Sequence, residues 1–139
     1  MKKLLKSTSG VTLLEVLLVL VIASLILVMS IRYYQTASQN AKVNAGMETL
    51  TGVMASVDSY LVAGNALAAM TATTLGPFMP NGAAPNNPWT GAPITVTGTA
   101  ANYTVGFANV PTAACTALNN LALQNNKITG TCTTYTIVP

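Results

Sequence analysis

The chain has 139 residues, of which 51% are hydrophobic and only 6% are charged. This length allows one small domain with an additional segment, and the charged fraction is far below the roughly 25% of ordinary soluble domains. The shortage of charges does not indicate intrinsic disorder, because disorder goes with low hydrophobicity and high net charge. The composition indicates a chain that spends part of its life in lipid or packed against copies of itself.

The net charge of +3 comes from the first ten residues, which contain Lys2, Lys3 and Lys6. In the rest of the chain Arg32, Lys42 and Lys127 balance Glu15, Glu48 and Asp58. A basic patch for nucleic acid is therefore not expected. Lysines placed before an apolar run are typical of the cytoplasmic side of a membrane segment.

Residues 11–31 form the longest apolar run, which contains one charge, Glu15, and is closed by Arg32. As a helix this run would span roughly 31 Å, the thickness of a bilayer core. A secretory signal is the alternative, but its apolar region runs only about 7–15 residues and ends in a small-residue cleavage site. The run is longer and has no such site at its end, so a retained membrane helix is expected.

The helical pattern continues without proline through residues 33–63. Apolar side chains recur there at spacings of three and four residues, which predicts an amphipathic helix with one core-facing stripe. The stripe consists of Val43, Met47, Leu50, Met54, Val57 and Leu61. Gly64-Asn65 is a typical helix stop. One helix of about fifty residues is expected, apolar all round in its first half and amphipathic in its second.

Residues 65–93 are rich in alanine, threonine, asparagine and proline. This composition predicts a long connecting loop, with a short helical turn near Ala66–Met70. Phe78 and Trp89 are expected to pin the loop to the globular part.

The remaining residues predict a small antiparallel sheet and a short helix. Ile94–Thr97 and Tyr103–Phe107 are β-branched or aromatic runs around a turn, which is the pattern of a hairpin. Pro111 opens a helix from Thr112 to about Leu123, and Ile128–Val138 is predicted to be a single strand. The fold class is therefore α+β, with a long N-terminal helix packed on a small antiparallel sheet.

Two cysteines, Cys115 and Cys132, lie near the C-terminus. In an exported domain they would form one disulfide, and two free buried thiols are the alternative. Closing a loop of this size stabilises by roughly 3 kcal/mol on the chain-entropy model. Because the chain has no histidine and only three acids, we expect no catalytic residues, no metal site and no cofactor.

The stretch from Ser9 to Val16, SGVTLLEV, resembles the prepilin processing motif of type IV pilins. The resemblance implies that residues 1–10 are a leader, that a prepilin peptidase cuts after Gly10, and that Val11 becomes an N-methylated new N-terminus. It assigns residues 11–31 to the transmembrane and assembly half of the helix, 32–64 to its amphipathic half, and 65–139 to a globular head with the pilin fold.

The same resemblance implies a major pilin that acts as the structural subunit of a type IV pilus. Its partners would be copies of itself in a helical homopolymer, the prepilin peptidase, and an inner-membrane assembly platform with a cytoplasmic ATPase. The precursor would lie in the inner membrane, and the mature chain would lie in an extracellular pilus of a bacterium. Such fibres serve adhesion, aggregation, motility or conjugation.

Within the family, residues 87–91 and 110–115 look like the type IVb branch, whose C-terminal disulfide encloses a surface region. Val11 in place of phenylalanine also favours that branch. The ten-residue leader is shorter than is usual there, and the helix lacks the proline that many pilins carry about twenty residues into the mature chain, near Ser30–Arg32.

Glu15 is the residue expected to control assembly. A carboxylate at mid-bilayer costs on the order of 3 kcal/mol on insertion scales. In a bundle of staggered helices, Glu15 could neutralise the amine of Val11 on a neighbouring subunit and so select the axial register, because an unpaired buried charge is penalised more than a paired one. The simpler alternative is an interfacial glutamate that reaches the headgroups.

Two other functions remain open. The chain could be a minor pilin or a pseudopilin of a type II secretion system, although many major pseudopilins bind calcium through C-terminal acids and no acid follows Asp58. It could also be a single-span membrane protein that never polymerises and carries a periplasmic binding domain.

Overall fold

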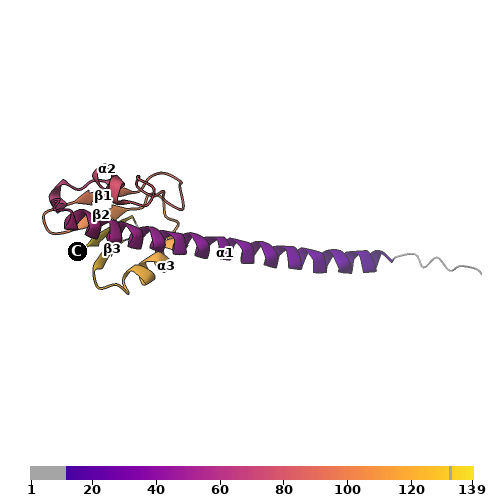
Figure 1. Ribbon diagram of the computed structural model, residues 1–139. Coiled ribbons are helices and arrows are strands. Elements are labelled where there is room, and N and C mark those ends of the chain that lie inside the picture. The colour runs from indigo at the N-terminus through magenta and orange to yellow at the C-terminus, as the bar shows by residue number, and fades with distance from the viewer. Residues whose placement is uncertain (1–11, 132) are drawn as a thin grey trace, which may run out of the picture. The chain divides into compact units, whose positions relative to one another are not determined.

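The computed structural model describes residues 12–131 and 133–139. The chain divides into two compact units between Ala37 and Ser38. The described part of the first unit is the beginning of helix α1, and the second unit contains the rest of α1 and every other element (Figure 1). The described residues do not include Gly10, Val11 or Cys132, so the predictions made for these three stay untested.

Helix α1 runs from Leu13 to Val62 and confirms the predicted long helix. Its start is capped by Thr12, whose hydroxyl accepts a hydrogen bond of 3.3 Å from the backbone N–H of Glu15. Its end is the predicted stop. Gly64 adopts a φ of 85°, which favours glycine, and the side-chain amide of Asn65 donates to the Tyr60 carbonyl at 3.1 Å.

The second half of α1 buries one face, but this face is shifted from the predicted stripe. Val43, Leu50 and Val57 are buried as expected, whereas the remaining three members of the stripe are only half-buried. The centre of the buried face also includes Val53 and Tyr60. Spacings of three and four residues define a face about 100° wide, and only the position of the sheet decides which flank of it points inward.

The segment after α1 contains three short helices: the 3-10 helix η1 (Leu67–Ala69), α2 (Ala72–Leu75) and the 3-10 helix η2 (Gly76–Phe78). The first lies where a helical turn was predicted, and the other two were not predicted. Helix α2 is held by a reciprocal cap: the Thr71 N–H donates to the Thr74 hydroxyl at 2.8 Å, and the Thr74 N–H donates to the Thr71 hydroxyl at 3.3 Å.

Four strands form one antiparallel sheet in the order β1-β2-β4-β3. Their bounds are Thr95–Gly98 for β1, Tyr103–Gly106 for β2, Ile128–Thr131 for β3 and Thr134–Ile137 for β4. The pairing of β1 with β2 confirms the predicted hairpin.

The single strand predicted over Ile128–Val138 is wrong, because this segment folds back on itself as the hairpin of β3 and β4. Gly130 allows this, with a φ of 136°. A Cβ at this position would lie 2.4 Å from the Thr134 carbonyl oxygen, so only glycine lets the two strands pass so closely.

Helix α3 runs from Thr112 to Ala122 and agrees with the predicted helix, with Pro111 at its N-cap position. Alternate strand residues point into a core shared with α1 and α3, and the opposite sheet face is exposed or half-exposed. That outer face is rich in threonine. One row across all four strands consists of Thr97, Thr104, Thr136 and Thr129. The observed architecture is the predicted α+β class.

The loop before β1 is pinned to the core by the two aromatic residues that the sequence singled out. Phe78 packs edge-on against Tyr60, with ring centroids 5.4 Å apart, and Trp89 packs edge-on against Phe107 at 6.0 Å. The buried Asn87 completes the attachment, because its side-chain amide donates to the Ala108 carbonyl at 2.7 Å.

Candidate functional site

The first candidate site is the apolar beginning of α1. From Leu13 to Ile31 its large apolar side chains are between 45% and 79% exposed, and no described part of the chain covers them. Among the described residues this is the one helix long and apolar enough to cross a membrane. A soluble monomer rarely exposes so large an apolar surface, so the segment is compatible with a membrane anchor.

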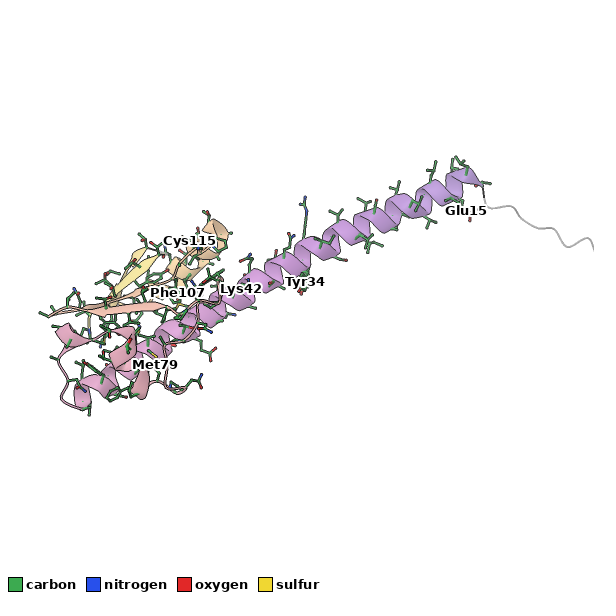
Figure 2. The ribbon with its side chains drawn as sticks, turned by 90° about the horizontal axis from the view of Figure 1, so that it is seen from above. Glu15, Tyr34, Lys42, Met79, Phe107 and Cys115 are labelled. Atoms are coloured by element: carbon green, nitrogen blue, oxygen red, sulfur yellow. The ribbon has the colours of Figure 1, made fainter. Side chains whose placement is uncertain are left out.

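Glu15 lies in the first turn of α1 and is the one charged residue between Thr12 and Ile31 (Figure 2). The hydroxyls of Ser24 and Ser30 in this segment donate to backbone carbonyls of their own helix at 2.8 Å. In residues 12–131 and 133–139 nothing is found to pair with the Glu15 carboxylate. The charge is therefore available to a group from outside this part of the chain.

Thr12 gives Glu15 a local environment that the prediction for Glu15 did not include. Thr12 caps the helix, and Glu15 occupies the third helical position, which is the Thr-x-x-Glu pattern of a capping box. A negative charge in the first turn also interacts favourably with the helix dipole. This Thr-x-x-Glu pattern can be read in the sequence. It gives Glu15 a role within its own helix, in addition to the predicted role between subunits.

The acids of the second unit lie far apart. Glu48 and Asp58 lie on α1 ten residues apart, roughly 15 Å along the helix axis, which is too far for a carboxylate pair. Over residues 12–131 and 133–139, no three side chains of the histidine, cysteine, aspartate and glutamate types gather as metal ligands would.

A groove of about 670 Å³ in the second unit is the second candidate site. It lies between α1 and the proline-rich loop that follows η2, and Glu48 is the one charged residue that lines it. Its walls are otherwise small, apolar or uncharged polar residues, among them Ala45, Gly52, Val53, Met79, Pro80, Ala84, Pro85 and Pro88. No sequence pattern indicated this groove, because it exists only when the loop folds against the helix.

Two buried tyrosines have perturbed acidity. Burial raises the pKa of Tyr135 to about 12, and its hydroxyl donates to Oδ1 of Asn119 at 2.7 Å. Burial, and in second place the negative charge of Asp58, also raise the pKa of Tyr103. Both side chains are buried in the core, where desolvation disfavours the charged phenolate.

Cys115 lies on α3 and is half-buried. Its predicted partner, Cys132, is outside the described residues, so the disulfide between them stays a prediction.

The comparisons with known proteins leave the family open. No family model matches the chain, no curated protein matches it, and no solved structure matches it.

Proposed function

We propose that the chain is the major pilin of a type IV pilus, made as a membrane-held prepilin and then polymerised into an extracellular fibre. The observation that carries this proposal is the exposed apolar segment Leu13–Ile31, which continues as one helix into the second unit, Ser38–Pro139, called the head from here on, with its own core. In water this segment has to be covered, and lipid before assembly and identical helices afterwards would both cover it.

Glu15 favours a second, non-lipid environment for this segment. Insertion scales penalise a carboxylate placed among exposed leucines, and the capping box with Thr12 would be served by an uncharged glutamine as well. Cleavage after Gly10 would create an amine on Val11, four residues before Glu15 in the same apolar zone. Pairing of this amine with Glu15 of a neighbouring copy would remove both penalties.

The end of the apolar segment fits a membrane-held precursor. Arg32 closes the run, and Tyr33 and Tyr34 follow it with 79% and 75% of their surfaces exposed. Tyrosines next to a cationic residue are typical anchors at a membrane–water interface. The precursor would thus present its head on the far side of the inner membrane, ready for extraction into a fibre.

The proposal is tested by shearing fibres from cells that express the chain and identifying the N-terminus of the recovered protein by mass spectrometry. A chain that begins with methylated Val11 is the expected result. Gly10→Leu is the matched control, because a bulky residue before the cut site should leave an uncut, unmethylated protein in the membrane. Recovery of the unaltered chain only as a full-length membrane resident, from cells that make surface fibres, would refute the proposal.

The groove favours one other candidate, a single-span membrane protein with a periplasmic binding domain. Its volume lies within the range of about 300–1,000 Å³ that is usual for small-molecule sites. This candidate predicts that residues 1–10 remain on the protein and that a soluble ligand co-purifies with the head.

A minor pilin or pseudopilin would instead be cleaved like a major pilin but would be rare in the sheared fibres.

A further inference from the structure

We propose that the groove beside Glu48 is the docking site for a second copy of this chain and that Lys127 of that copy enters it. This inference rests on the proposed function, because it describes a contact between heads in the fibre. It goes beyond that function by assigning a specific, charged contact to a surface of the head that the N-terminal segment does not involve.

The groove presents one charge in an apolar setting. Glu48 is exposed, and no ion pair to it is found in the part of the chain that the structure describes. The walls include Val53, Met79 and three prolines, so an occupant must bring apolar surface together with a single cationic group. An acidic or purely polar occupant would leave the Glu48 charge uncompensated.

Lys127 carries the complementary chemistry. It is exposed in the connection between α3 and β3, and its carbonyl accepts a hydrogen bond of 3.1 Å from the N–H of Val138. Val138 is 53% exposed, and Leu123 at the end of α3 is 55% exposed. A lysine flanked by uncovered apolar side chains matches a groove that is apolar around one carboxylate.

The other charged residues of the head fit this pairing less well. Lys42 is half-buried rather than exposed. It lies on α1 six residues before Glu48, on a different side of the same helix. Asp58 is the other acid of the head and does not line the groove. Glu48 is thus the acid that lines the groove, and Lys127 is the exposed lysine of the head.

The positions of the two surfaces in the head make the contact suitable for a polymer. Figure 1 shows α2 above the second half of α1 and α3 below it, and Figure 2 shows Met79, which lines the groove, well apart from Cys115 of α3. A patch that binds a different patch on the next copy makes a heterologous contact, and such contacts continue into rings or open filaments.

Charge reversal tests the pairing in the full chain, with fibre yield in sheared fractions as the readout. Glu48→Lys and Lys127→Glu should each lower the yield at least tenfold, and the double variant should restore most of it. Asp58→Lys is the matched control on the same helix and should leave the yield within about twofold. Failure of the double variant to recover, or recovery by Arg32→Glu or Lys42→Glu instead of Lys127→Glu, overturns the assignment.

Cross-linking distinguishes a second copy from other occupants. Fibres of the Glu48→Cys, Lys127→Cys double variant should give a ladder of covalent multimers on a non-reducing gel after mild oxidation, and each single variant should not. Fibres that form from the double variant without any ladder would refute the docking while leaving the pilin proposal intact. Absence of fibres from the unaltered chain would refute both.

Discussion

The hydroxyl of Tyr135 on β4 donates a 2.7 Å hydrogen bond to Oδ1 of Asn119 on α3. Tyr135 is fully buried, and its ring packs edge-on against Phe107 at 6.3 Å. Tyr135 therefore connects the sheet to α3 and to the aromatic pair of Phe107 and Trp89, which holds the loop before β1.

Tyr135→Phe should lower the free energy of unfolding of the head by about 1 kcal/mol, because the ring packing is kept while Asn119 loses its partner. Thermal unfolding of the full chain in detergent measures this loss. Tyr33→Phe is the matched control, since Tyr33 is 79% exposed and should tolerate the change without effect. Equal stabilities of the two variants would show that the bond contributes nothing.

The head should lose stability as the pH rises above about 10. Burial holds the pKa of Tyr135 at about 12 in the folded state, above the ordinary value of about 10. A raised folded-state pKa contributes stability that is complete below pH of about 10 and is lost as the pH rises toward about 12. The free energy of unfolding, followed over this pH range, should fall more steeply for the unaltered chain than for Tyr135→Phe. Parallel curves would contradict the expectation.

Gly46 on α1 should not tolerate a side chain. A Cβ at this position would lie 2.8 Å from Cη2 of Trp89, whereas a Cβ on Gly52 would meet nothing within 4 Å. Gly52→Ala should therefore stabilise the helix by up to about 1 kcal/mol through propensity alone. Gly46→Ala should destabilise the head by about 1 kcal/mol, because displacing the packed Trp89 ring outweighs the same gain.

Denaturant unfolding of both glycine variants, together with Trp89 fluorescence, separates these effects. The fluorescence of Trp89 should shift only in Gly46→Ala. An equal stabilisation of both variants would show that the indole ring moves away from α1 without cost.

Variants of Glu15 and Thr12 distinguish a role of Glu15 between subunits from a role within its own helix. Glu15→Gln keeps the capping-box pattern with Thr12 but removes the charge that a neighbouring amine would need. We expect Glu15→Gln to be cleaved normally and to give few fibres, and Thr12→Ala, which weakens the cap instead, to be cleaved and to assemble. Fibre yields that fall for Thr12→Ala but not for Glu15→Gln would assign Glu15 to the helix end alone.

The predicted disulfide between Cys115 and Cys132 is tested by the mass of the alkylated protein. Without reducing agent neither cysteine should react, and after reduction both should. Cys115→Ser should destabilise the head by roughly 3 kcal/mol through the lost cross-link. Complete alkylation of the unreduced, unfolded chain would show two free thiols.

The amino-acid sequence by itself determined the features that depend on neighbours along the chain. The apolar run, the absence of proline and the Gly64-Asn65 stop specify helix α1 almost to its last residue, because helix propagation and capping are local events. The hairpin of β1 and β2 follows from two β-branched runs around a short turn for the same reason.

The tertiary structure alone decided the features that join distant segments. The strand order places β4 between β2 and β3, and alternation of side chains cannot specify which strands become neighbours. The approach of Gly46 to Trp89 and the groove beside Glu48 both require the loop to fold onto a helix more than thirty residues earlier in the chain. Such contacts depend on the packing of the whole head, because burial stabilises by total area and complementary shape rather than by any local pattern.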